Sequence, residues 1–169
     1  MNKKTKSTLI GAVGGIILGG YTDDCIRRQK VLNQAREYCK QTGKKLLNLS
    51  CGSTDFGDVN ADITQQNVKN FVLYKPDVPL PFEDKEFGAV YCAHTLEHVD
   101  NPIWLLDELN RVSDKIFVVL PEWYQVGYFL PTHKWLPLDQ TGTKWIKNPF
   151  YSKQISEKKT DWSRNPFVK

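Results

Sequence analysis

The sequence predicts an α/β domain built on a mostly parallel, open β-sheet, and three observations carry that prediction. Two runs, 87–93 and 115–120, are almost continuously apolar, which is typical of strands buried on both faces of a parallel sheet. Between them lies a strong helix start, Asp100-Asn101-Pro102, followed by apolar residues at helical spacing. Because parallel strands need a crossover connection, this alternation favours parallel pairing.

The composition fits one globular domain and argues against several partners. The chain has 169 residues, of which 40% are hydrophobic and 25% charged. Its net charge of +4 is divided between the N-terminus and the tail, whereas nucleic-acid binding needs a concentrated basic stripe. The four cysteines form no C-x-x-C pair and none stands at zinc-ligand spacing from a histidine. We therefore expect no nucleic-acid partner, no disulfide, no bound metal and a cytoplasmic location.

Residues 1–21 differ in character from residues 22–169 and are predicted to be a leader. Three lysines precede an apolar, glycine-rich run, 8–21, which is shorter than the roughly 20 residues of a membrane-spanning helix. Gly11, Gly15 and Gly19 repeat every four positions, a spacing used for close helix packing in membranes. Two alternatives stay open: a loosely packed leader, or an anchor that associates the protein with a membrane.

The remaining elements follow from local signals. A helix is expected over 23–42, capped by Asp23 or Asp24 and ended by Gly43. Strands are predicted at 45–49 and 59–63, a strand or helix at 68–74, and a proline-rich link at 76–81. The helix after Asn101 is expected to bury one face, made of Ile103, Leu106, Leu109 and Val112.

This pattern defines a core at 45–121 and an aromatic-rich tail at 122–169. The aromatic residues of the tail are expected to cover the sheet. One weak strand is expected at 144–146, so the C-terminal strands of the sheet are predicted to be reduced.

The ends of three predicted strands carry residues suited to a nucleoside ligand. In open parallel sheets ligands bind beyond the carboxyl ends of the strands. Small residues after the first strand, 50–54, let the backbone approach a ligand closely. Asp62, at the end of the second strand, could accept both hydroxyl hydrogens of a ribose. Asp77 could accept a hydrogen bond from an adenine amino group.

The order of these segments resembles type 11 class I methyltransferases, which depend on S-adenosylmethionine. Residues 46–52 (LLNLSCG) look like the first family motif, and 77–87 (DVPLPFEDKEF) resemble its D-x-x-x-L-P-F-x-D-x-x-F segment. Residues 94–99 (HTLEHV) resemble its S-H-x-L-E-H signature, and 59–62 (VNAD) match a subgroup with a shortened first loop. The sequence departs from the family at the first acid, here Asn48, and at the first glycine, here Ser50.

The resemblance implies a Rossmann-like fold with flanking helices, and S-adenosylmethionine as the cofactor. The favoured function is methyl transfer to an acceptor that is a small molecule or linked to a lipid. His94 is the candidate catalytic residue, whereas His98 is expected to be structural because H-T-L-E-H is not the zinc-protease spacing. The cofactor-binding residues that the resemblance implies are Asn48, Ser50, Cys51, Gly52, Asp62, Ile63, Asp77, Val78, Ala93 and His94.

Two other functions remain as alternatives. One is a non-catalytic, degenerate Rossmann-like binding module, which Ser50 and the reduced C-terminal strands would fit. The other is a nucleotide-sugar or dinucleotide enzyme with a similar sheet. The absence of G-x-G-x-x-G argues against the latter.

Overall fold

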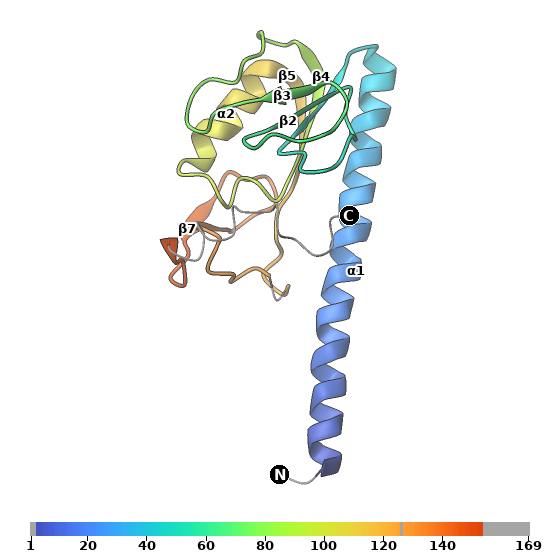
Figure 1. The fold of residues 1–169 in the computed structure, drawn as a ribbon, viewed down its shortest axis with the longest axis vertical. Coiled ribbons are helices and arrows are strands. Elements are labelled where there is room, and N and C mark those ends of the chain that lie inside the picture. The colour runs from blue at the N-terminus through green and yellow to red at the C-terminus, as the bar shows by residue number, and fades with distance from the viewer. Residues whose placement is uncertain (1–2, 126, 154–169) are drawn as a thin grey trace.

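The computed structural model describes residues 3–125 and 127–153, and a five-stranded sheet forms its centre (Figure 1). The strands lie in the order β3-β2-β1-β4-β5, and each neighbouring pair is parallel. This confirms the predicted Rossmann-like α/β fold. Because all strands run the same way, their carboxyl ends meet at one side of the sheet, which we call the carboxyl edge. The strands are β1 (Leu46–Leu49), β2 (Val59–Asp62), β3 (Phe71–Leu73), β4 (Phe87–Ala93) and β5 (Ser113–Val119).

Two helices bury the two faces of this sheet. Residues Leu32, Ala35 and Cys39 of α1 (Lys3–Thr42) pack on one face, and Leu105 and Leu109 of α2 (Pro102–Val112) pack on the other. The strand residues alternate between the faces, as the pleat requires. Toward α1 lie Leu46, Ala89 and Tyr91, and toward α2 lie Leu47, Val90 and Cys92. The two-sided burial explains why β4 is apolar along its whole length.

Helix α1 does not begin at Asp23, as the sequence analysis predicts, but runs without interruption from Lys3. Glycines weaken a helix by about 1 kcal/mol each without ending it, so the leader continues the helix. The predicted cap residue Asp24 lies inside α1 and forms an ion pair with Arg28, one turn later. The predicted end is correct, because Gly43 takes the left-handed conformation with φ of 69°. In the described part of the chain, no helix has the length and apolar character needed to cross a membrane.

Helix α2 begins where predicted but buries a different face. The Asn101 side chain accepts a hydrogen bond from the Trp104 N–H (3.0 Å), and Pro102 occupies the first turn. The buried residues are Pro102, Leu105, Leu109 and Val112, whereas the predicted Ile103 is 43% exposed. Apolar residues occupy four consecutive positions, 103–106, so the spacing alone cannot choose between two adjacent faces.

The tail forms a separate hairpin instead of extending the main sheet. Strands β6 (Trp135–Pro137) and β7 (Trp145–Lys147) pair with each other in antiparallel register, and β7 corresponds to the weak strand expected at 144–146. The backbone N–H groups of Lys134 and Trp135 donate to the Glu97 carbonyl oxygen, at 2.8 and 3.2 Å. The tail is thereby fixed to the loop after β4, at the carboxyl edge.

Candidate functional site

The loop after β1 meets the end of β2 at the carboxyl edge. The Gly52 N–H donates to Asp62 Oδ2 (2.9 Å), and the Cys51 N–H donates to the Ala61 carbonyl (3.0 Å). Gly52 has a positive φ of 51°, and a Cβ added there would meet nothing within 4 Å. This short loop is therefore tied to β2 on one side and open on the other, which suits a ligand that approaches the backbone closely.

The Asp62 carboxylate is oriented by its own neighbours. Its Oδ1 accepts hydrogen bonds from the N–H and the hydroxyl of Thr64, both at 3.0 Å, while Oδ2 accepts from Gly52. Asp62 is buried, and the adjacent Ile63 is 46% exposed. Each carboxylate oxygen has two lone pairs, so Oδ2, which among the described residues accepts only from Gly52, can accept a further hydrogen bond from a hydroxyl group.

Asn48 lies beneath this loop. Its side chain is buried within β1, and Nδ2 donates to Asn60 Oδ1 (3.0 Å) and to the Thr54 carbonyl (3.2 Å). The Asn60 amide in turn contacts Gly57, where the chain passes very close to β1. A carboxylate at position 48 could not donate these bonds, so this arrangement requires the amide. Asn48 thus supports the loop from within the sheet.

Ser50 occupies a conformation that favours glycine. Its φ is 54°, and its hydroxyl lies 3.0 Å from the Tyr74 hydroxyl. Burial raises the pKa of Tyr74, so both hydroxyls stay neutral near pH 7. Burial, reinforced by the nearby Asp62 charge, also raises the pKa of Cys51 to about 11. The Cys51 thiol is therefore protonated near neutral pH and not poised as a nucleophile.

Asp77 and Val78 lie on the connection that leaves β3. Tyr74, at the start of this connection, donates its N–H to the Asp62 carbonyl (3.1 Å), which brings the connection to the carboxyl edge. Asp77 and Val78 follow within four residues, and both side chains are exposed. Because β2 and β3 are parallel, the connection that carries Asp77 and Val78 leaves β3 at the edge where Asp62 ends β2.

His94 follows β4 and lies between two carboxylates. Its Nε2 is 2.8 Å from Asp24 Oδ1 on α1, and its Nδ1 is 3.1 Å from Glu97 Oε1. When both carboxylates are ionised, both ring nitrogens donate to them, and this arrangement favours the imidazolium. Burial alone would lower the pKa of His94, but the hydrogen bonds to Asp24 and Glu97 outweigh burial and raise it.

The two carboxylate contacts hold His94, the candidate catalytic residue, in one orientation. Both nitrogens of His94 contact carboxylates, so the ring could act as a base only after it lost a proton and one of these contacts broke. Its φ of 52° adds backbone strain, which the bond from its N–H to the Val119 carbonyl (2.9 Å) helps to hold. Ala93, half-buried, ends β4 just before it. The sequence analysis could not find Asp24 as a partner because 70 positions separate it from His94.

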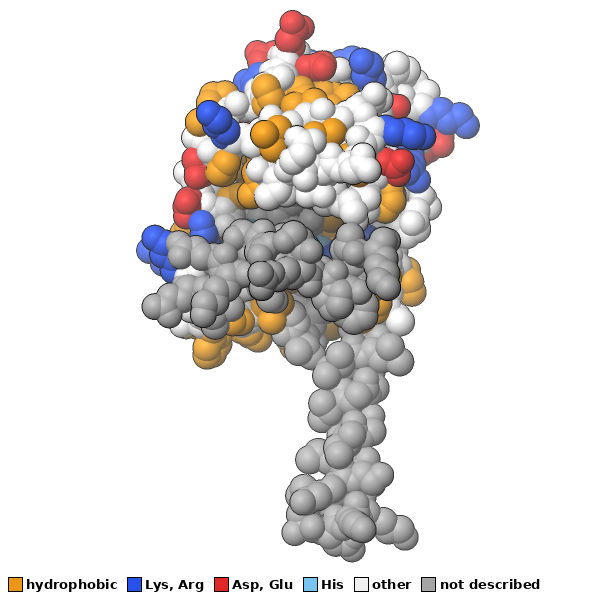
Figure 2. Space-filling view, in the orientation of Figure 1, with side chains coloured by type: hydrophobic (Ala, Val, Ile, Leu, Met, Phe, Trp, Pro, Cys, Tyr) orange, Lys and Arg blue, Asp and Glu red, His pale blue; other side chains and the backbone are white. Residues whose placement is uncertain are grey.

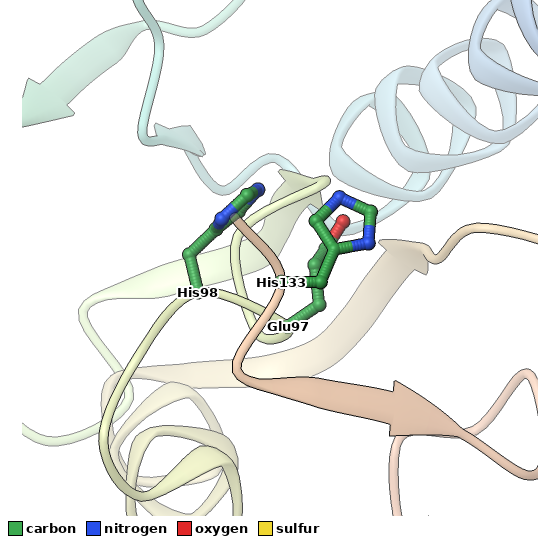
Figure 3. A group of neighbouring side chains, drawn as sticks. All are labelled: Glu97, His98 and His133. Carbon is green, nitrogen blue, oxygen red and sulfur yellow. The ribbon is translucent and has the colours of Figure 1, made fainter. Parts of the chain in front are cut away.

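Glu97 and two histidines form a second group beside His94. Glu97 is fully buried, while His133 on the tail is 5% exposed and His98 is exposed. Figure 3 shows the three side chains gathered where the loop after β4 meets the segment that leads into β6. Burial by itself would raise the pKa of Glu97, but the hydrogen bond and charge of His94, with the neighbouring histidines, lower it. Burial lowers the pKa of His133 and keeps that ring neutral.

Figure 2 shows Lys and Arg interspersed with Asp and Glu on the face in view. Two surface grooves lie away from the carboxyl edge, one along α1 beside Lys115 and Phe117, and one beneath Gly57 at the opposite end of β1. The chemistry of the strand ends, and not the size of a groove, therefore identifies the candidate site.

Comparison with known proteins gives one match. Residues 33–115 match a family model described as a methyltransferase domain. The matched segment begins within α1, includes the junction of Gly52 with Asp62 and the loop with Glu97, and ends within β5. No curated protein and no solved structure matches the chain.

Proposed function

Because residues 33–115 match a methyltransferase domain model, we propose that the protein binds S-adenosylmethionine at the carboxyl edge and transfers its methyl group. The acceptor that we propose is a small or lipid-linked molecule. The observation that carries the proposal is the junction between the Gly52 N–H and Asp62 Oδ2, which joins an open backbone turn to an oriented carboxylate. This pair of features suits a nucleoside with a ribose diol.

The residues at the junction fit such a cofactor. The side of Gly52 where a Cβ would project has no atom within 4 Å, which leaves room for a ligand against the backbone. Asp62 would accept hydrogen bonds from the ribose hydroxyls, and Asp77 with Val78 would flank the adenine. Ser50, Cys51 and Gly52 would lie along the methionine part, supported from below by Asn48. Ala93 and His94 would lie near the sulfonium.

The bound cofactor supplies a methyl group already activated on a sulfonium, so the chain need only align donor and acceptor. Two contacts at the described carboxyl edge support this role of the chain, because they hold Asp62 and His94 in fixed orientations. Asp62 is oriented by Thr64, and each ring nitrogen of His94 contacts a different carboxylate. His94 would then orient the loop after β4 and would not need to accept a proton.

Calorimetric titration of the full chain with S-adenosylmethionine and S-adenosylhomocysteine tests the proposal. We expect micromolar binding of both ligands by the wild-type protein. Asp62→Asn keeps the shape of the side chain but removes its charge, and should weaken binding at least about tenfold, because hydrogen bonds to charged groups contribute about 1.5–3 kcal/mol. Asp55→Asn, an exposed acid in the same loop, is the matched control and should leave affinity unchanged.

A second candidate function, a non-catalytic binding module, is favoured by one observation. Ser50 places a side chain, bonded to Tyr74, where the family has glycine. If the folded wild-type protein binds neither ligand but Ser50→Gly does, then Ser50 has closed the cofactor site and the non-catalytic function is supported. If neither protein binds either ligand, the cofactor proposal itself is wrong.

A further inference from the structure

One oxygen of a fully buried carboxylate has no partner among the described residues. Glu97 is 0% exposed, and while its Oε1 faces His94, its Oε2 has no hydrogen-bond partner. An unpaired buried carboxylate oxygen is costly, and such a group calls for an explanation such as a bound ion. Glu97 also belongs to a group of three side chains: one ligand atom each of Glu97, His98 and His133 lies within 4.8 Å of the others (Figure 3).

The hydrogen bonds of the two histidines leave a lone pair on each ring. His98 Nδ1 lies 3.1 Å from the Thr132 carbonyl, and His133 Nδ1 lies 3.1 Å from the Tyr128 carbonyl. A carbonyl can only accept, so each Nδ1 carries the proton and each Nε2 of a neutral ring carries a lone pair. Metal-binding histidines show this arrangement, in which a backbone carbonyl fixes the tautomer and the orientation of the ring.

The third side chain of the group, the Glu97 carboxylate, is also held in a fixed orientation. Glu97 Oε1 is held by His94, whose other nitrogen is held by Asp24, so the carboxylate is fixed from its outer side. The Glu97 carbonyl accepts from Lys134 and Trp135, the two residues after His133. These bonds hold the tail histidine against the loop that carries Glu97 and His98. Hydrogen bonds to other residues therefore bring the three side chains together, without any hydrogen bond among the three.

We propose that Glu97, His98 and His133 form a binding site for a divalent transition-metal ion, with Zn²⁺ the best fit. Two imidazole nitrogens and one carboxylate oxygen are an established ligand set for Zn²⁺ with one position left open. Zn²⁺ bonds of about 2.0–2.1 Å place tetrahedral ligand atoms about 3.4 Å apart, so binding requires the groups to close by roughly 1–1.5 Å. His98 is exposed and can make that movement without disturbing the core.

The sequence analysis expects no metal because it tests only local spacing. Glu97 and His98 are adjacent, and the third ligand comes from the tail, 35 positions after His98. The inference stands apart from the cofactor proposal, since the ligand atoms belong to the loop after β4 and the tail, not to the loop that carries Gly52.

Titration of the untagged, chelator-treated full chain with Zn²⁺ alone tests the site. We expect one bound equivalent by calorimetry and elemental analysis, and visible absorption bands of a tetrahedral site when Co²⁺ replaces Zn²⁺. His98→Ala removes an exposed ligand without opening the core, and Glu97→Gln removes the charge. Each should weaken Zn²⁺ binding at least about tenfold.

Two variants serve as controls for binding elsewhere. Cys25→Ser removes the exposed thiol among the described residues, and Glu83→Gln removes an exposed carboxylate, so both should bind one equivalent like the wild type. Absence of Zn²⁺ binding by the folded wild-type protein would overturn the proposal, as would unchanged binding by both His98→Ala and Glu97→Gln. Because S-adenosylmethionine is absent from this titration, its result is independent of the cofactor proposal.

Discussion

The two halves of the carboxyl edge are built in opposite ways. At the β1–β2 half, the contacts join residues close in sequence, such as Gly52 and Asp62, and leave an open side next to the backbone. At the β4 half, an ionic chain of Asp24, His94 and Glu97 joins α1 to the loop. The first half has the features of a ligand surface, and the second has those of a framework that holds charged groups in fixed places.

The largest effect should come from breaking the framework. Glu97→Ala removes a fully buried carboxylate and leaves the His94 imidazolium with one partner, so we expect a loss of about 3–5 kcal/mol in the free energy of unfolding. Urea denaturation in the presence of a chelator measures this loss without any contribution from metal. Glu83→Gln, on the exposed surface, should change stability by less than about 0.5 kcal/mol. Equal effects of the two substitutions would show that the ionic chain contributes little.

A pair of glycine substitutions separates backbone strain from ligand contact. Gly52 and Gly43 both have positive φ, at 51° and 69°, and a Cβ at either would meet nothing within 4 Å. Alanine at each position should therefore cost a similar 1–2 kcal/mol or so of stability. Only Gly52→Ala should also weaken binding of S-adenosylhomocysteine, because Gly43 lies at the end of α1, away from the carboxyl edge. Unchanged ligand affinity in Gly52→Ala would show that the open side of the loop is not the binding surface.

The smallest effect is expected at Ser50. Ser50→Gly relieves a left-handed conformation, which costs about 1–2 kcal/mol in a residue with a side chain. It also loses the contact with the Tyr74 hydroxyl, worth about 1 kcal/mol, so the net change in stability should be within about 1 kcal/mol of zero. Thermal unfolding, compared with Ser53→Gly on the exposed part of the same loop, measures the difference. A loss above about 2 kcal/mol would mean that the Ser50–Tyr74 contact anchors the loop.

Local signals predicted the elements whose causes are local. The apolar run 87–93 became β4 with the same bounds, and Asn101 caps α2 as expected. The predicted helix start at Asp23 was wrong. The residues before Asp23 are also helical, so Asp23 lies inside α1 and does not cap its N-terminus. β6 was not predicted, since three residues joined only to β7 leave too short a pattern.

The same distinction applies to the candidate site. The placement of Gly52 beside Asp62 follows from two strands separated by one short loop, so the sequence analysis could bring them together. The contacts of His94 with Asp24, and of the loop with His133, depend on how α1 and the tail pack, which no local pattern records. The role of Asn48 was also hidden, because its partners became visible only once the loop closed over β1.

Because α1 is uninterrupted, its N-terminal half projects from the domain in one fixed direction. The helix turns back at Gly43 into parallel strands, so its first half extends past the sheet on the side toward which the strands end (Figure 1). At 1.5 Å per residue, the stretch from Lys3 to Asp24 extends about 30 Å beyond the point where His94 contacts Asp24 of the helix. A structure that bound the first turn of α1 would therefore lie at a fixed distance from the domain, and the carboxyl edge would face it.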